Sequence, residues 1–108
     1  AGVISGGTYT KTPMNDGTGR SVLVQSFVVQ AKDRDTISFP IQFSNSNVQL
    51  NLTSQYDNSG EGGSSIANFV DGTLTASSFQ IDTRQVWSGG NGGNSTYNKI
   101  NVTATGVL

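Results

Sequence analysis

The sequence contains no cysteine and no histidine. Without cysteine the chain has no disulfide framework, no thiolate nucleophile and no zinc ribbon. Without histidine it lacks the usual general acid or base near neutral pH, so that only carboxylate pairs such as Asp57 with Glu61 remain. A glycosidase with two such carboxylates needs a deep cleft, for which 108 residues leave little room. We therefore expect a protein that binds or builds and is not an enzyme.

Charged residues and long apolar runs are also scarce. Only 12% of the residues are charged, with 6 basic against 7 acidic side chains. The basic residues are scattered along the chain, so the electrostatic footprint of a protein that binds nucleic acid is missing. No run of about 20 apolar residues is present, and we expect no membrane insertion. The abundance of Asn, Ser and Thr beside so little charge favours an extracellular or virion surface.

Motifs for metals and cofactors are missing as well. A strong calcium site needs about six to eight oxygen ligands, and Asp33 with Asp35, or Asp57 with Glu61, supplies too few. The glycine-rich runs are not followed by the Lys, the Ser or Thr and the helix of a phosphate-binding loop. We expect no metal and no cofactor.

The pattern that is present is that of one small all-β domain. A chain of 108 residues fits one domain. Apolar residues alternate with period two in several segments, and no segment has a useful helical period. We predict one all-β domain of short antiparallel strands.

Three segments give the clearest strand patterns. Segment 36–43 places alternate apolar residues on one side, with Pro40 on the opposite parity, which suggests a sheet edge or a bulge. Segment 48–53 repeats the pattern after a short turn, and we expect the two to reverse direction. Segment 21–31 is apolar at both parities, which predicts a central strand covered on both faces.

The remaining segments complete the sandwich. Segments 66–70 and 73–81 flank Asp71 and Gly72, which suit a tight hairpin turn, and a shift of parity predicts a bulge near Ser77 and Ser78.

Segment 100–105 alternates as a closing strand. Residues 1–20 are broken by Gly and Pro, so we expect an N-terminal arm with one short strand around residues 3–9, which in a fibre protein would continue an upstream shaft. Residues 21–108 then form the binding domain.

Polar loops point to a binding site at one end of this domain. If successive strands reverse direction, loops 32–35, 57–65 and 88–96 gather at the same end. Aromatic rings there can stack on the C–H face of a sugar while polar groups bind its hydroxyls. The candidate ligand-binding residues are Trp87, Tyr97, Tyr56, Asp57, Asn58, Glu61, Arg34, Arg84, Asn91 and Asn94.

Each aromatic residue of this set has a purely structural alternative. Trp87 is the leading ligand contact, and it suits equally well a place in the core or in a subunit interface. Tyr56 and Tyr97 suit packing at the rim of the domain better than contact with a ligand.

The stretches TISFPIQF (residues 36–43) and VQLNLT (residues 48–53) resemble the H-type lectin fold and the related C-terminal tips of bacteriophage tail fibres. Residues 70–81 and 100–106 continue the resemblance, which covers roughly Ser21 to Leu108. It implies a six-stranded antiparallel sandwich assembled as a homotrimer, with polar loops at or near the distal tip. No His accompanies Trp87, so the sugar specificity of the animal lectins does not carry over.

Three functions fit these features. The leading one is the receptor-binding tip of a phage tail fibre or tail-like particle, whose partner is a bacterial cell-surface glycan, either lipopolysaccharide or another polysaccharide. A free carbohydrate-binding lectin and a non-binding structural or decoration module of a virion are the alternatives. The structural module predicts that Trp87 and Tyr97 are buried between subunits, whereas the other two predict an exposed aromatic beside convergent polar groups.

Overall fold

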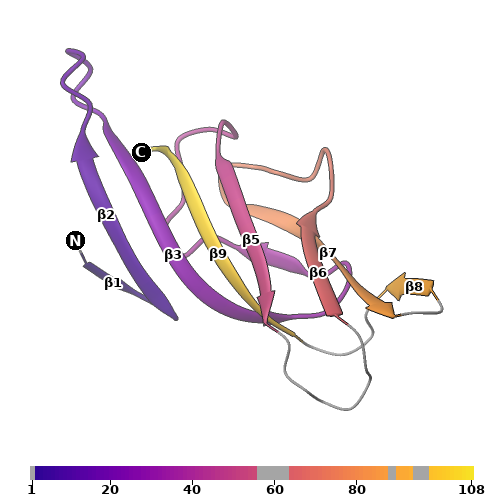
Figure 1. The fold of residues 1–108 in the computed structure, drawn as a ribbon. Coiled ribbons are helices and arrows are strands. Elements are labelled where there is room, and N and C mark those ends of the chain that lie inside the picture. The colour runs from indigo at the N-terminus through magenta and orange to yellow at the C-terminus, as the bar shows by residue number, and fades with distance from the viewer. Residues whose placement is uncertain (1, 56–63, 88–89, 94–97) are drawn as a thin grey trace.

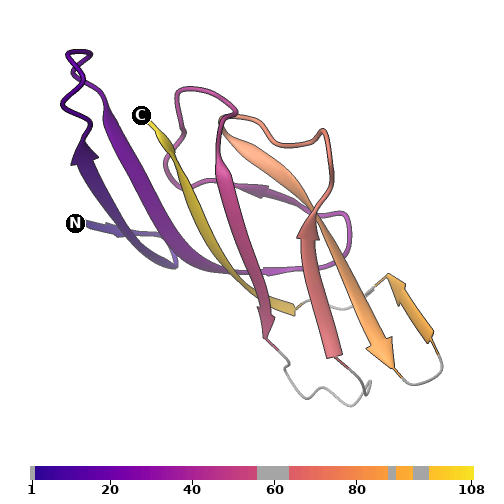
Figure 2. The ribbon, with the colours of Figure 1, turned by 45° about the horizontal axis from the view of Figure 1, so that its top comes forward.

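The chain folds as an all-β protein in a computed structural model that describes residues 2–55, 64–87, 90–93 and 98–108. These residues include no helix, and hence none long and apolar enough to cross a membrane. They form nine strands in two antiparallel sheets (Figure 1; Figure 2). The predicted antiparallel all-β class is therefore confirmed, with more strands than the six expected.

The first sheet has five strands, with β3 in the middle as predicted for a central strand. Its order is β1 (Gly2–Ile4), β2 (Gly7–Pro13), β3 (Ser21–Ala31), β9 (Asn98–Val107) and β5 (Gln49–Gln55). Residues that pair directly across antiparallel strands share a face, so this register assigns each side chain to the core or to the opposite side.

The second sheet is built around β7 (Ser78–Trp87). One edge of β7 pairs with β6 (Ser64–Phe69). The other edge pairs first with β4 (Thr36–Ser38) and, at its far end, with β8 (Gly90–Gly93). In Figure 2, β6, β8 and the end of β7 lie beyond β5 on one side of the molecule, while β1 and β2 extend the first sheet on the opposite side.

The core fills the space between the two sheets. Phe39 lies against Phe43 with ring centroids 5.1 Å apart and against Phe79 at 5.6 Å. The predicted inward faces are confirmed, because the alternate apolar residues of segments 36–43 and 100–105 are buried or half-buried. The buried apolar residues are Leu23, Phe27, Ala31, Ile37, Phe39, Phe43, Val48, Phe79, Ile81, Ile100, Val102 and Ala104.

Segment 36–43 keeps its alternation of exposed and buried side chains, but only its first three residues pair as a strand. Regular pairing ends at Ser38, and the reason is visible two residues further on. Pro40 has no N–H for a ladder. Beyond Pro40, the fully buried Gln25 side chain replaces the missing strand partner. Its Nε2 donates to the Ile41 carbonyl at 2.8 Å, and its Oε1 accepts from the Ile41 N–H at 3.0 Å.

Pro40 suggests an edge or a bulge. The strand of this segment, β4, does lie at the edge of its sheet, but it ends two residues before Pro40. Segments 36–43 and 48–53 do not pair with each other: β4 belongs to one sheet and β5 to the other.

The prediction that β3 is covered on both faces is wrong for the single chain. Val24 and Val28 point away from the core and are 36% and 45% exposed. The second sheet lies on only one side of β3, so no described segment covers the other side. We call this uncovered side of the five-stranded sheet the outer face.

The hairpin between β6 and β7 forms, although its connection is longer than predicted. Thr73 N–H bonds to the Val70 carbonyl at 3.2 Å around Gly72, whose φ is 82°, so the Asp71–Gly72 turn exists. A second turn follows, in which Thr75 N–H bonds to the Ser78 carbonyl at 2.8 Å. The shift of parity thus comes from two consecutive turns and not from a bulge within a strand.

The N-terminal segment contributes two strands where one was expected. Residues 7–13 pair with β3 along their whole length, and β1 folds back on β2. Gly7 makes this close approach possible, since a Cβ atom there would collide with the Ser26 carbonyl oxygen.

Candidate functional site

The candidate site lies along one edge of β7, where loop 32–35 fits between β4 and β8. Arg34 N–H bonds to the Ile81 carbonyl at 2.9 Å, and Ile81 N–H bonds to the Asp35 carbonyl at 2.9 Å. The Asp33 carboxylate then accepts the N–H of Thr83 at 3.0 Å. The loop therefore continues the hydrogen-bond ladder of β4 along β7. Backbone groups of the loop bond to Ile81, and the Asp33 side chain bonds to Thr83.

Both carboxylates of the loop accept hydrogen bonds from backbone N–H groups of the chain. Asp33 holds the buried Thr83, and Asp35 Oδ2 accepts the Lys32 N–H at 3.1 Å. No group of three or more acidic, His or Cys side chains that could hold a metal occurs in the described part of the chain. These carboxylates shape the loop, and the loop shows no cage of oxygen ligands.

Arg34 is the residue that the loop presents to solvent. Its backbone has a φ of 69°, in the left-handed region that side chains other than Gly rarely adopt. Its carbonyl accepts a hydrogen bond from Gln80 Nε2 at 3.0 Å, so both its N–H and its C=O are held by the second sheet. The side chain is 55% exposed, with Nε 4.0 Å from Asp33 Oδ2. A strained backbone that holds a charged group outward is a feature typical of binding sites.

The described strands bring further predicted residues to the same edge. Arg84 follows Thr83 directly and pairs with Gly93. Along β7, the pairing with β8 therefore starts one residue after the contact with loop 32–35. Asn91 stands opposite Val86, and Trp87 ends β7 opposite Gly90. Loops 32–35 and 88–96, grouped by strand parity, are therefore neighbours along β7 in their described parts.

The other predicted contacts lie beyond the described structure. The side chains of Trp87, Arg84 and Asn91 are outside it, and so are six whole residues, which are Tyr56, Asp57, Asn58, Glu61, Asn94 and Tyr97. Their role in binding stays a prediction, and so does the burial of Trp87.

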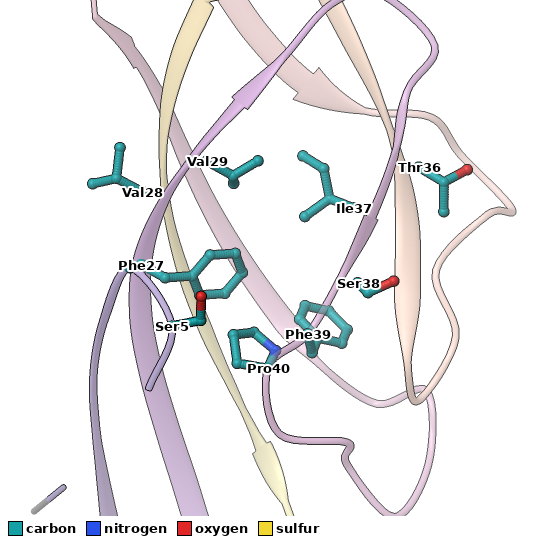
Figure 3. A pocket seen from close by; sticks show the side chains of 10 residues that line it. Ser5, Phe27, Val28, Val29, Thr36, Ile37, Ser38, Phe39 and Pro40 are labelled. Atoms are coloured by element: carbon teal, nitrogen blue, oxygen red, sulfur yellow. The ribbon is translucent and has the colours of Figure 1, made fainter. Parts of the chain in front are cut away.

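A hollow that the sequence did not predict lies beside the open edge of β4. It has a volume of about 360 Å³ and lies between the β1–β2 turn, β3 and residues 36–40. Figure 3 shows the rings of Phe27, Phe39 and Pro40 close together, with Ser5 beside Phe27. Its volume falls within the usual range of ligand sites, roughly 300–1,000 Å³. Its walls carry hydroxyls but no charged group, so it could pack an apolar moiety and could not catalyse acid–base chemistry.

One sequence signal could have located this hollow. Pro40 marks an edge, and an edge strand leaves alternate backbone groups unpaired. The part contributed by Ser5 and Gly6 could not have been found, because it depends on how the N-terminal hairpin packs on β3.

Comparison of the chain with models of protein families, with characterised proteins and with solved structures gives no match.

Proposed function

We propose that this chain is the receptor-binding tip of a phage tail fibre or tail-like particle and that it binds a bacterial cell-surface glycan without transforming it. The observation that carries the proposal is loop 32–35, which is fixed to β7 by backbone and side-chain hydrogen bonds and presents Arg34 outward. The resemblance of segments 36–43 and 48–53 to tail-fibre tips supports the same function.

The chemistry of Arg34 suits a bacterial surface glycan. A guanidinium group offers five N–H donors in a planar fork, which match sugar hydroxyls and, more strongly, the phosphates and carboxylates of acidic saccharides. Because the loop is held in place before a ligand arrives, binding costs little additional ordering. Trp87, at the end of the same edge, supplies the stacking ring of the proposed site.

A homotrimer would raise the affinity of such a tip. Three weak sites on one particle act at a high effective concentration, which can raise avidity by about 10² to 10⁴ without a new contact. The virion tail fibre is the location that this function implies.

The test is adsorption of the chain to bacterial cells and to a lipopolysaccharide and polysaccharide array. We expect Arg34→Gly to weaken adsorption at least tenfold while the fold is retained, because Gly adopts a positive φ without strain. We expect Trp87→Ala to abolish adsorption. Arg20→Ala is the matched control, since it removes an exposed basic side chain from the β2–β3 turn and should leave adsorption unchanged.

Two results would contradict the proposal. One is a folded wild-type chain that binds neither cells nor any glycan on the array. The other is normal adsorption by both Arg34→Gly and Trp87→Ala.

A non-binding structural or decoration module of a virion is the second candidate, and the outer face of the first sheet, with Lys99 as its one charged residue in the described strands, favours it. A chain that assembles but binds no glycan would fit this candidate. A free lectin of the same fold would bind glycans in solution without any connection to a fibre shaft.

A further inference from the structure

The outer face of the five-stranded sheet has an unusual surface. One row across it consists of Val3, Thr8, Ser26, Thr103 and Asn51, paired in register from β1 to β5. The neighbouring rows continue with Thr, Val, Asn and Gln. Lys99 is the one charged residue that the register places on this face within the described strands.

This face exposes apolar side chains on two of its strands. Val24 and Val28, 36% and 45% exposed, belong to the middle strand β3, and Val3, 85% exposed, belongs to the edge strand β1. The other strands carry mainly hydroxyl and amide side chains on this face. A hollow of about 240 Å³ beside Val28 is lined by Gly6, Gly7 and Thr103 among others. Exposed apolar side chains beside groups that can form hydrogen bonds are typical of protein interfaces.

We propose that copies of this chain associate with one another through the outer face. The inference rests on the proposed assembly of the tip, and it names the surface that holds the assembly together. It also differs from a purely structural interface built on Trp87 and Tyr97, because β7 belongs to the other sheet.

The chemistry of the face favours a second copy of the chain as its occupant. A hydroxyl group both donates and accepts hydrogen bonds, so the hydroxyls of a Thr-rich face can pair with those of the same face on another copy. A charged partner would find only Lys99 as a charge on this face within the described strands. Thr and Val are also stiff at χ1, so burying them costs less side-chain entropy than burying Lys or Glu.

The size of the face agrees with a specific contact. Its strands have 3, 7, 11, 10 and 7 residues. A residue covers about 16 Å² of a sheet at the usual spacings of about 4.8 Å and 3.3 Å, which gives roughly 600 Å² per copy. This is the lower end of the roughly 600–1,000 Å² that each partner buries in a stable interface.

The experiment is light scattering coupled to size-exclusion chromatography of the whole chain over a range of concentrations. We expect the wild type to elute at a multiple of the monomer mass. Val28→Lys places a charge at the centre of the face and should weaken association at least tenfold. Val24→Lys and Thr10→Lys, at further exposed positions of the face, should do the same if Val28→Lys fails to fold.

The matched control is Gln42→Lys, which adds the same charge at an exposed position outside this sheet and should keep the wild-type mass. A monomeric wild type overturns the inference, and so does a wild-type mass for the folded lysine variants. Glycan adsorption is measured on the same samples. An oligomer that the variants dissociate but that binds no glycan would sustain this inference and refute the receptor-tip function.

Discussion

At the scale of single residues, Gln25 makes the contact that replaces missing strand pairing. It lies on β3, is fully buried, and forms two hydrogen bonds with the backbone of Ile41. These bonds join the first sheet to the segment that leaves the second sheet after Ser38. A buried amide in this position is costly without partners, and here both of its polar atoms are satisfied.

We predict that Gln25→Leu lowers the free energy of unfolding by about 2–4 kcal/mol, because it leaves the N–H and C=O of Ile41 without partners. Urea denaturation measures this loss. Gln42→Leu, one residue beyond Ile41 and exposed, is the matched control and should change the stability by less than about 0.5 kcal/mol. Equal stability of Gln25→Leu and wild type would show that water satisfies the Ile41 backbone.

Gly106 on β9 provides the space for the ring of a distant aromatic residue. A Cβ atom at this position would lie 2.8 Å from Cδ1 of Phe43, so the aromatic ring packs directly on the backbone of β9. Gly106 is the last residue of segment 100–106, which is part of the resemblance to tail-fibre tips. Its partner, 63 positions earlier in the chain, follows only from the folded structure.

At the scale of elements, loop 32–35 is an integral part of the second sheet. The Asp33 side chain pairs with the backbone of Thr83 where neither β4 nor β8 reaches β7. The ion pair with Arg34, at 4.0 Å and largely exposed, contributes little, because such surface pairs are worth about 0–1 kcal/mol.

We predict that Asp33→Ala costs about 1–3 kcal/mol, since the buried Thr83 N–H loses its acceptor. Asp33→Asn keeps an oxygen acceptor and should retain most of the stability, which separates the hydrogen bond from the charge. Thermal or urea unfolding compares the three chains. If Asn costs as much as Ala, the charge of Asp33 matters and this explanation is wrong.

Alternation predicted the faces of elements better than their lengths. In segment 36–43 every side chain has the predicted orientation, yet only Thr36–Ser38 pairs as a strand. Parity depends on local backbone geometry, whereas pairing requires a free neighbouring edge. Beyond Ser38 the Gln25 amide holds the Ile41 backbone.

At the scale of the whole molecule, the N-terminal hairpin extends the first sheet beyond the second. β2 pairs with β3, while Ile4 and Tyr9 pack against the core from the side. The hairpin is thus joined to the rest of the protein by its pairing with β3 and by these two side chains. Whether the chain unfolds as one unit depends on the strength of these contacts.

We predict that Gly7→Ala destabilises the protein by about 1–3 kcal/mol, because the new methyl group collides with the backbone of Ser26. Ser5→Ala, at the exposed turn of the same hairpin, is the control and should be near neutral. Urea unfolding and amide exchange of β2 measure both variants. Normal stability of Gly7→Ala would mean that the hairpin does not pack on β3 in solution.

The candidate site was predicted in part. The sequence grouped loop 32–35 with loop 88–96 from strand parity, and β8 does lie beside that loop along β7. The sequence could not show that Asp33 is used by the fold while Arg34 is presented to solvent. That division depends on which carboxylate meets the Thr83 N–H, a contact between residues 50 positions apart.

The sequence alone determined the all-β class, the parity of segments 36–43 and 100–105 and the central place of β3, because these follow from the period of apolar residues and from backbone geometry. Only the tertiary structure decided which strands pair, where the Gln25 amide replaces a strand, and which side of β3 is left uncovered. These depend on long-range contacts that compete for the same edges and faces, and no local pattern encodes the outcome of that competition.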